Sequence, residues 1–332
     1  MEVVLIPAYK PDNRLTELVE GLIKDPTIGV LVVDDGSGPE YEDIFGRLAG
    51  KAVVIAHEVN LGKGMALRTG LSEVIRHYPE CTCVIFADSD GQHPVPDILA
   101  IRDKCLKEDS FILTTRIFGK MPFRSRIGNS FIRLMYAVLN HQYYSDNQCG
   151  LRAFPVSMTE MMMEVPGDRY EYEMAMLIRA EKTGVRIVPF YREAVYMEDN
   201  ASSHFRPVAD SVRVVGRMSM SELPSIVGAV IRMITMIMIP YSGVKAVIVY
   251  AVAGLISGIL TTLMYSLIYI QSGYRDAGRE ICWRVITDII TAAAAFGLSS
   301  LTGMHRMAAF LIAVTVFWLV KYRILKLLSA GK

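Results

Sequence analysis

The sequence predicts an α/β domain with a largely parallel sheet over residues 1–222, followed by an all-α domain of apolar helices over residues 223–332. Three observations support this division. Short apolar runs alternate with helical patterns in the first part, which is typical of a parallel sheet covered on both faces. Several of these runs end in polar, turn-forming residues. The last third contains long apolar stretches, which raise the hydrophobic fraction of the 332-residue chain to 52%.

The apolar runs and helical spacings give the order of the elements. Strands are expected at residues 3–6, 29–33, 52–56, 83–87 and 111–115. Helices are expected at residues 13–24, 64–77, 97–108 and 124–141. Ligands of such sheets collect at the carboxyl ends of the strands. Three strands with polar ends therefore predict one nucleotide cleft at that edge.

Charge and cysteine content exclude some classes of function. The net charge is +1, which gives no overall attraction to nucleic acid. The five cysteines form neither a paired framework nor a zinc spacing, so a reduced, cytosolic compartment is expected. No basic segment or cleavage site precedes the first strand, so we expect no signal peptide.

The stretch at residues 88–93 provides the most informative polar motif. It follows a buried strand and places Asp88, Asp90 and Gln92 at alternate positions, before two prolines end the strand. Two carboxylates and an amide oxygen pointing at one spot suit Mg²⁺ or Mn²⁺, with substrate phosphates completing the ligands. In isolation, the same pattern would also suit a solvated turn that caps the next helix.

Two other strand ends carry candidate nucleotide ligands. Asp34 and Asp35 either accept hydrogen bonds from a base and a ribose or cap the turn that Gly36 begins. Lys63 lies between two glycines in a segment too short for a phosphate-binding P-loop. It either faces a diphosphate or marks a loop-to-helix junction.

A basic face is expected on the helix at residues 124–141. Arg126, Ser130 and Arg133 fall at positions i, i+4 and i+7, and therefore on one side. Arginine and a hydroxyl suit a phosphate monoester, which a guanidinium binds with two hydrogen bonds. A solvated basic face is the alternative.

These motifs resemble a known family. Residues 7–9, 34–37, 60–64 and 88–93 are similar to the family-2 inverting glycosyltransferases of the GT-A fold, which is Rossmann-like. Within them the chain looks most like the polyprenyl-phosphate glycosyltransferases related to dolichyl-phosphate mannose synthase. Residues 150–152, 169–173 and 200–205 resemble bacterial members fused to a GtrA-like membrane domain.

The resemblance implies a donor site at the strand ends. Its nucleoside-binding residues are Pro7, Ala8, Tyr9, Asp34 and Asp35, with Lys63 as a further nucleotide ligand. The resemblance implies that Asp88, Asp90 and Gln92 bind the metal and the diphosphate, and that catalysis depends on Asp88 and Asp90. The implied cofactor is a divalent cation, Mg²⁺ or Mn²⁺, and UDP-glucose is the first candidate among nucleotide sugars.

The resemblance also implies an acceptor site for a lipid phosphate. Arg126 and Ser130 would bind this phosphate, with His204 and Arg206 as a second clamp. A phosphomonoester has a second pKa of about 6 and is mostly dianionic at neutral pH, so no strong general base is needed. The expected reaction is a single displacement with inversion that moves a hexose to undecaprenyl phosphate and gives a lipid-linked sugar for the cell envelope.

The last third of the sequence predicts contact with a membrane. Four apolar stretches occur at residues 223–241, 246–270, 285–303 and 306–321. A spanning helix needs about 20 apolar residues. The first stretch contains Arg232, so it either spans the bilayer or lies on its surface. Basic residues near 275–284 and 321–326 favour a multi-pass protein of the cytoplasmic membrane with its catalytic domain in the cytosol. The partners are then a nucleotide sugar, a polyprenyl phosphate and the bilayer, with a homo-oligomer left open.

Two other functions remain open from the sequence. A family-2 enzyme that elongates a polysaccharide would usually carry a Q-x-x-R-W string, which this chain lacks. A non-catalytic membrane transporter or flippase scaffold would have no need for the complete set of Asp88, Asp90 and Gln92.

Overall fold

The chain divides into two compact units. A computed structural model describes residues 1–117, 123–140, 142–193, 207–221, 223–238, 252, 256–260, 263–264 and 277–330. The first unit contains Met1–Arg133, Tyr144–Glu181 and Val185–Arg217, and the second contains Leu134–Tyr143, Lys182–Gly184 and Met218–Lys332. The expected domain boundary at residue 222 stays a prediction.

The first unit is built on a sheet whose described strands have the order β3-β2-β1-β4-β6-β5-β7. Four neighbouring strands are parallel: β1 (Glu2–Ala8), β2 (Ile28–Asp34), β3 (Val53–Ala56) and β4 (Cys83–Phe86). The others are β5 (Phe111–Ile117), β6 (Arg152–Pro155) and β7 (Ile187–Glu193). β6 is antiparallel to β4 and β5, whereas β5 and β7 are parallel. The five predicted strands are confirmed, and β6 and β7 were not predicted.

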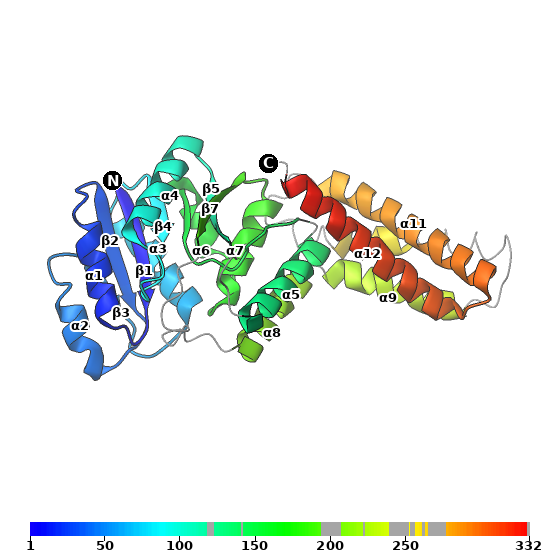
Figure 1. Cartoon of the computed structure of the whole chain (residues 1–332), viewed down its shortest axis with the longest axis horizontal. Helices are drawn as coiled ribbons and strands as arrows, with labels where there is room; N and C mark the ends of the chain where they lie inside the picture. Colours follow the sequence, from blue (N-terminus) through cyan, green and yellow to red (C-terminus); the bar gives the residue numbers. More distant parts are fainter. Residues whose placement is uncertain are drawn as a thin grey trace. The chain divides into compact units, whose positions relative to one another are not determined.

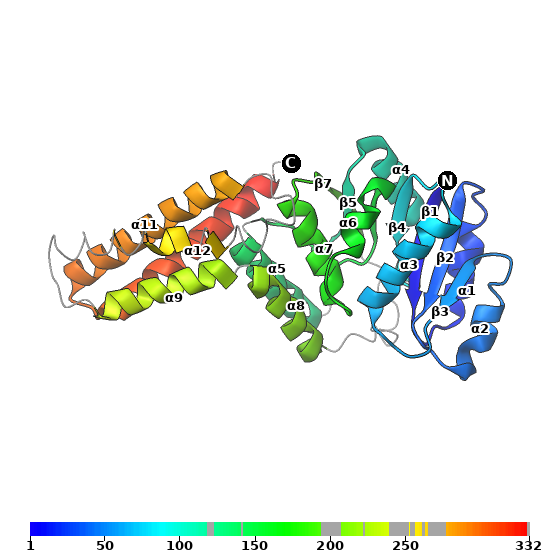
Figure 2. The ribbon, with the colours of Figure 1, turned by 180° about the vertical axis from the view of Figure 1, so that it is seen from behind.

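Helices cover both faces of this sheet. α1 (Asn13–Leu22) and α4 (Val95–Glu108) lie on one face (Figure 1), where they bury apolar side chains in the core. α3 (Lys63–His77) crosses the other face, seen in Figure 2, and packs so closely that a Cβ on Gly70 would lie 2.2 Å from Leu5 Cδ1. The remaining described helices of the α/β region are η1 (Pro39–Tyr41), α2 (Glu42–Gly46), α5 (Phe123–Asn140), η2 (Val156–Met158), α6 (Thr159–Met163), α7 (Glu171–Lys182) and α8 (Pro207–Ser221).

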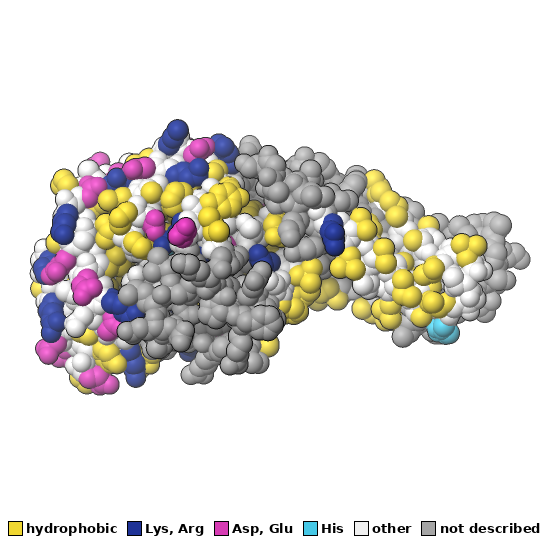
Figure 3. All heavy atoms as spheres, in the orientation of Figure 1, with side chains coloured by type: hydrophobic (Ala, Val, Ile, Leu, Met, Phe, Trp, Pro, Cys, Tyr) yellow, Lys and Arg dark blue, Asp and Glu magenta, His cyan; other side chains and the backbone are white. Residues whose placement is uncertain are grey.

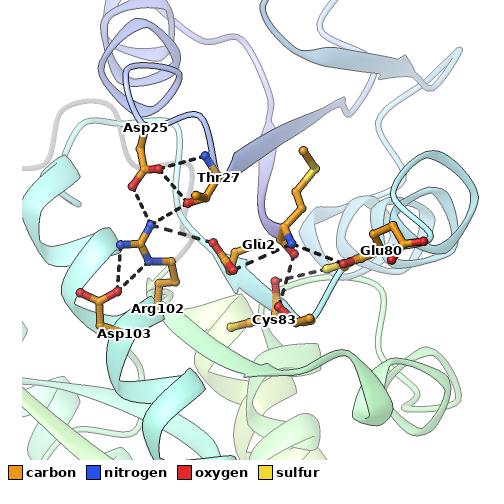
Figure 4. Close-up of polar contacts among 10 residues, drawn as sticks. Glu2, Asp25, Thr27, Glu80, Cys83, Arg102 and Asp103 are labelled. Carbon is orange, nitrogen blue, oxygen red and sulfur yellow. Dashed lines mark hydrogen bonds and ion pairs between the residues drawn. The ribbon is translucent and has the colours of Figure 1, made fainter.

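An ion-pair network holds the amino ends of the central strands. Arg102 of α4 lies 2.7 Å from Asp25 before β2, 2.8 Å from Asp103, and 4.0 Å from Glu2 at the start of β1 (Figure 4). The network joins α4 to the beginnings of two strands. It lies at the sheet edge opposite the carboxyl ends, where the sequence predicts the functional residues.

The second unit contains long apolar helices. They are α9 (Leu223–Met238), α11 (Ala277–Thr302) and α12 (Arg306–Ala330). Ala295 and Phe310 are buried where α11 meets α12, with Met233 of α9 against them. Many other large apolar side chains of these helices are exposed, including Ile290 and Val316, and Figure 3 shows hydrophobic side chains gathered over this unit.

The expectation of four membrane spans is not supported by the described helices. Within the ranges given above, no helix combines the length and the apolarity needed to cross a membrane. Most of the predicted stretch at residues 246–270 lies outside the described residues.

Candidate active site

A cavity of about 360 Å³ lies at the carboxyl ends of β1, β2 and β4 within the first unit. Its walls come from the end of β1, from the segments that follow β1, β2, β3 and β4, and from two residues just before α7. The lining residues are Pro7, Ala8, Tyr9, Lys10, Pro11, Asp12, Arg14, Asp35, Asn60, Gly62, Lys63, Asp88, Ser89, Asp90, Arg169 and Tyr170.

The cavity brings together most of the predicted donor-site residues. Seven of them line it: Pro7, Ala8, Tyr9, Asp35, Lys63, Asp88 and Asp90. Asp34 and Gln92 are not among its lining residues. The backbone N–H of Gln92 donates to Asp90 Oδ1 at 3.0 Å. The roles assigned to all of these residues stay predictions.

The two acids at the end of β2, Asp34 within the strand and Asp35 after it, stabilise local structure. Asp34 Oδ1 accepts from the backbone N–H of Ser37 at 2.9 Å, which favours the turn-capping alternative for this residue. Asp35 is 3% exposed. Its two oxygens lie 2.8–2.9 Å from four groups of the loop after β3: His57 Nδ1, Asn60 Nδ2, and the N–H groups of Leu61 and Gly62. Asp35 thus fixes the loop that presents Lys63 to the cavity.

Asp88 and Lys63 form an ion pair inside the cavity. Lys63 Nζ lies 2.7 Å from Asp88 Oδ1 and 3.1 Å from Glu173 Oε2. Burial by itself would raise the pKa of Asp88, but the basic groups around it, with the charge and hydrogen bond of Lys63 foremost, together lower the pKa to about 2. Burial also opposes the charge on Lys63, yet Asp88 and Glu173 raise its pKa above the ordinary value. Both groups of the pair are therefore charged at neutral pH.

His93 holds Asp88 in position through a hydrogen bond to its backbone. Its Nδ1 accepts from the backbone N–H of Asp88 at 3.0 Å, and its Nε2 lies 3.9 Å from Asp88 Oδ2. Burial lowers the pKa of His93 to about 4, although the charge of Asp88 acts in the opposite direction. His93 is therefore neutral at pH 7, with Nδ1 as acceptor and the proton on Nε2. This assigns it a positioning role that the sequence pattern did not reveal.

The buried, neutral His93 gives a pH dependence to folding. Its folded pKa of about 4 lies below the ordinary value of 6.5, so the unfolded chain binds the proton more strongly as the pH falls between these values. Stability is lost in this window, by about 2 kcal/mol between pH 7 and pH 5. Urea unfolding at the two pH values checks this, and His93→Gln is expected to remove most of the difference. An equal loss in the variant would contradict the assignment.

The donor set fits a divalent cation that takes further ligands from a substrate. Asp88 and Asp90 both line the cavity. Burial and the charge of Asp88 raise the pKa of Asp90, so a cation there would relieve an unfavourable pair of negative charges. Among the described residues, no group of three or more His, Cys, Asp or Glu side chains could hold a metal ion. Asp88 and Asp90 would supply two carboxylates, and phosphate oxygens further ligands.

A buried arginine supports the wall behind Asp88. Arg152, 0% exposed, donates to the carbonyl oxygens of Asn147, Cys149 and Glu173. These bonds fix the loop before β6, where Gly150 lies so close to Asp88 that a Cβ would be 2.5 Å from its Oδ2. The same arginine thus holds the loop beside Asp88 and the first turn of α7, which carries Glu173.

Several cavity residues were not singled out by the sequence. Arg14 is bound by the carboxylate of Asp12, and its aliphatic stem lies 3.2 Å from where a Cβ of Gly91 would be. Lys10 lies 5.5 Å from the ring centre of Tyr9. Each is an ordinary basic residue in the linear sequence, and only the fold shows that they share a cavity with the two acids.

The predicted acceptor residues are described only in part. Ser130 Oγ accepts from Arg133 Nη2 at 2.8 Å, and Arg133 Nη1 donates to the carbonyl of Ser145 at 2.9 Å. Arg126 belongs to α5, but its side chain lies outside the described part of the chain, as do His204 and Arg206 entirely. Their predicted binding of a lipid phosphate stays a prediction.

Comparison with known proteins finds a family model and several relatives that match the part of the chain holding most of the cavity residues. Residues 3–162 match the model of the family described as Glycosyl transferase family 2. An uncharacterized protein of Methanocaldococcus jannaschii is 28% identical over 206 residues, which cover 60% of this chain and 83% of that protein. A UDP-N-acetylglucosamine–dolichyl-phosphate N-acetylglucosaminyltransferase of Methanococcus voltae is 27% identical over 217 residues, covering 59% and 86%. The matched family segment ends before residue 223, so the GtrA-like assignment stays a prediction.

Solved structures confirm the fold of this part. Glucosyl-3-phosphoglycerate synthase from Mycobacterium tuberculosis, in complex with Mn²⁺, UDP and phosphoglyceric acid, aligns with a TM-score of 0.50 and 17% identity. The alignment covers 68% of this chain and 78% of that chain. At this identity the likeness establishes the fold alone. It confirms the predicted α/β domain of the GT-A type.

Proposed function

We propose that the chain, whose residues 3–162 match the family described as Glycosyl transferase family 2, moves a hexose from a UDP-sugar to a polyprenyl phosphate. The observation that carries the proposal is the cavity at the strand ends, where Asp88 and Asp90 lie among basic side chains. Such a mixture suits a diphosphate together with a divalent cation. In a bacterium the acceptor would be undecaprenyl phosphate, and glucose is the first candidate for the sugar.

The chemistry of the cavity wall supports a nucleotide donor. Pro7, Ala8 and the ring of Tyr9 give one apolar side on which a base can pack. Lys63 and Arg169 supply positive charge for the diphosphate. The preference for UDP rests on the activity named for the Methanococcus voltae relative.

The proposed mechanism is a single displacement with inversion. Asp88 and Asp90 would hold a divalent cation, which when bound neutralises charge on the departing diphosphate. His93 keeps Asp88 in place through the Asp88 backbone N–H, and Arg152 fixes the loop beside it. An acceptor phosphate is already mostly dianionic, with a second pKa of about 6, so the chain needs to orient it rather than deprotonate it.

The proposed acceptor implies a reaction at a membrane surface. A polyprenyl phosphate is held in the bilayer by its hydrocarbon chain, and we place the enzyme on the cytosolic side of the cytoplasmic membrane, where nucleotide sugars are made. Arg126, Ser130, His204 and Arg206 are the proposed ligands of the lipid phosphate. The exposed apolar side chains of α11 and α12 support a role of the second unit in holding the protein at the lipid.

A donor panel tests this proposal. The full-length protein is incubated in detergent with a short-chain polyprenyl phosphate and radiolabelled UDP-glucose, UDP-galactose, UDP-N-acetylglucosamine or GDP-mannose, with and without EDTA. We expect label in the chloroform-soluble fraction with one UDP-sugar, and its loss with EDTA. A parallel reaction contains phosphoglycerate as the acceptor, and label that enters only a water-soluble product would overturn the lipid acceptor.

A further inference from the structure

Lys63 lies between two carboxylates that come from distant parts of the chain. Its Nζ contacts Asp88 after β4 at 2.7 Å and Glu173 of α7 at 3.1 Å. The ring centre of Tyr170 is 5.8 Å away. The Lys63 side chain is 16% exposed and that of Glu173 is 8% exposed. The ammonium is thus largely shielded from water but still reaches the cavity.

The backbone around Lys63 is fixed. Gly62 has a φ of +104°, and a Cβ at this position would lie 2.4 Å from the carbonyl oxygen of Asp168. The backbone N–H of Met65 donates to the same carbonyl at 3.1 Å. The loop is therefore held against the segment before α7. A change in the contacts of the ammonium has to come from rotation of the Lys63 side chain.

The Lys63 ammonium already pairs with the carboxylate of Asp88, which a divalent cation would need as a ligand. A divalent cation that approaches Asp88 meets a positive charge already at hydrogen-bond distance from its Oδ1. In the described ranges no larger acidic cluster offers the cation a different site. A nucleoside diphosphate changes this balance because it brings negative oxygens into the cavity. Lys63 can then exchange Asp88 for a phosphate oxygen while Glu173 continues to neutralise it.

We propose that Lys63 makes cation binding at Asp88 and Asp90 depend on the nucleotide. Without nucleotide, its ammonium keeps the divalent cation off Asp88; with a nucleoside diphosphate, it turns to the phosphates and the cation enters. This inference rests on the proposed donor class and adds to it a mutual dependence of the two ligands. Thermodynamic linkage requires that the cation strengthen nucleotide binding by the same factor as the nucleotide strengthens cation binding.

Binding of Mn²⁺, measured by the electron paramagnetic resonance signal of the free ion, tests the proposal without any assay of activity. For the full-length wild-type protein we expect Mn²⁺ to bind at least about tenfold more tightly with UDP than without it. Lys63→Met is expected to bind Mn²⁺ alone at least about tenfold more tightly than the wild type, with little further gain from UDP. Titration calorimetry of UDP with and without Mn²⁺ should give the same factors.

Lys10→Met is the matched control, since it removes one positive charge from the same cavity wall, and it should bind Mn²⁺ alone as the wild type does. Equal affinity of the wild type and Lys63→Met for Mn²⁺ alone would overturn the proposal. If Lys63→Met fails to fold, Lys63→Gln, which keeps a hydrogen-bond donor, replaces it. Absence of any UDP effect in the wild type, alongside tighter Mn²⁺ binding by the variant, would count against the proposed donor and overturn the dependence on nucleotide, and would support only the exclusion of the cation from Asp88 by Lys63.

Discussion

Replacing Asp88 with asparagine is expected to lower kcat/KM for sugar transfer by at least about 100-fold. Asparagine keeps the size of the side chain but removes the charge that faces the cavity beside Lys63. The cation then loses one of two protein carboxylates, and the departing diphosphate loses part of its stabilisation. Initial rates over a range of donor and Mn²⁺ concentrations measure the effect.

The matched control is Asp103→Asn, the same chemical change in an exposed residue that pairs with Arg102 at the opposite end of the sheet. We expect it to leave kcat/KM near the wild-type value. A similar loss in both variants would mean that general destabilisation, rather than the cavity charge, explains the result. Unchanged turnover in Asp88→Asn would contradict the assigned role of Asp88.

The largest effect on stability is expected for Arg152→Met. Arg152 is fully buried and donates to three backbone carbonyl oxygens, two in the loop beside Asp88 and one on Glu173. Methionine fills much of the volume but leaves these oxygens without their donor. Since each buried, unsatisfied polar group costs about 1–3 kcal/mol, we expect a loss of at least about 3 kcal/mol in the free energy of unfolding. Urea denaturation followed by circular dichroism measures it.

Arg186→Met provides the comparison for this prediction. Arg186 is 69% exposed and pairs with Glu108 at 3.1 Å, and exposed pairs of this kind contribute about 0–1 kcal/mol. Its loss should therefore be small. If Arg152→Met were as stable as Arg186→Met, the loop before β6 would have to be held by other contacts.

The sequence predicted the parallel half of the sheet because its signals are local. The runs that became β1, β2 and β4 are apolar and end abruptly in polar turn residues. Parallel strands bring such ends to one edge, so the meeting of Tyr9, Lys63 and Asp90 at one cavity follows from the topology. β6 was missed because it is a short strand that begins with Arg152, whose charged side chain is buried against three backbone carbonyl groups, one of them on Glu173, 21 positions away.

The detailed roles of the acids could not be predicted in the same way. Asp34 and Asp35 are adjacent, yet one caps a turn and the other binds the loop at residues 57–62. The contact between Lys63 and Glu173 joins residues 110 positions apart, on elements with no sequence pattern in common. Long-range pairs of this kind depend on the whole fold. Motifs therefore indicate where a site lies more reliably than which groups of the site contact each other.

The most direct test of the account is the position of the cation and nucleotide in a crystal. Crystals of the full-length protein would be soaked with Mn²⁺ and UDP, and diffraction collected at the manganese absorption edge. We expect an anomalous peak within about 2.5 Å of carboxylate oxygens of Asp88 and Asp90, with the diphosphate on its other side and the base near Tyr9. A peak or a nucleotide bound elsewhere, with this cavity unchanged, would contradict the account.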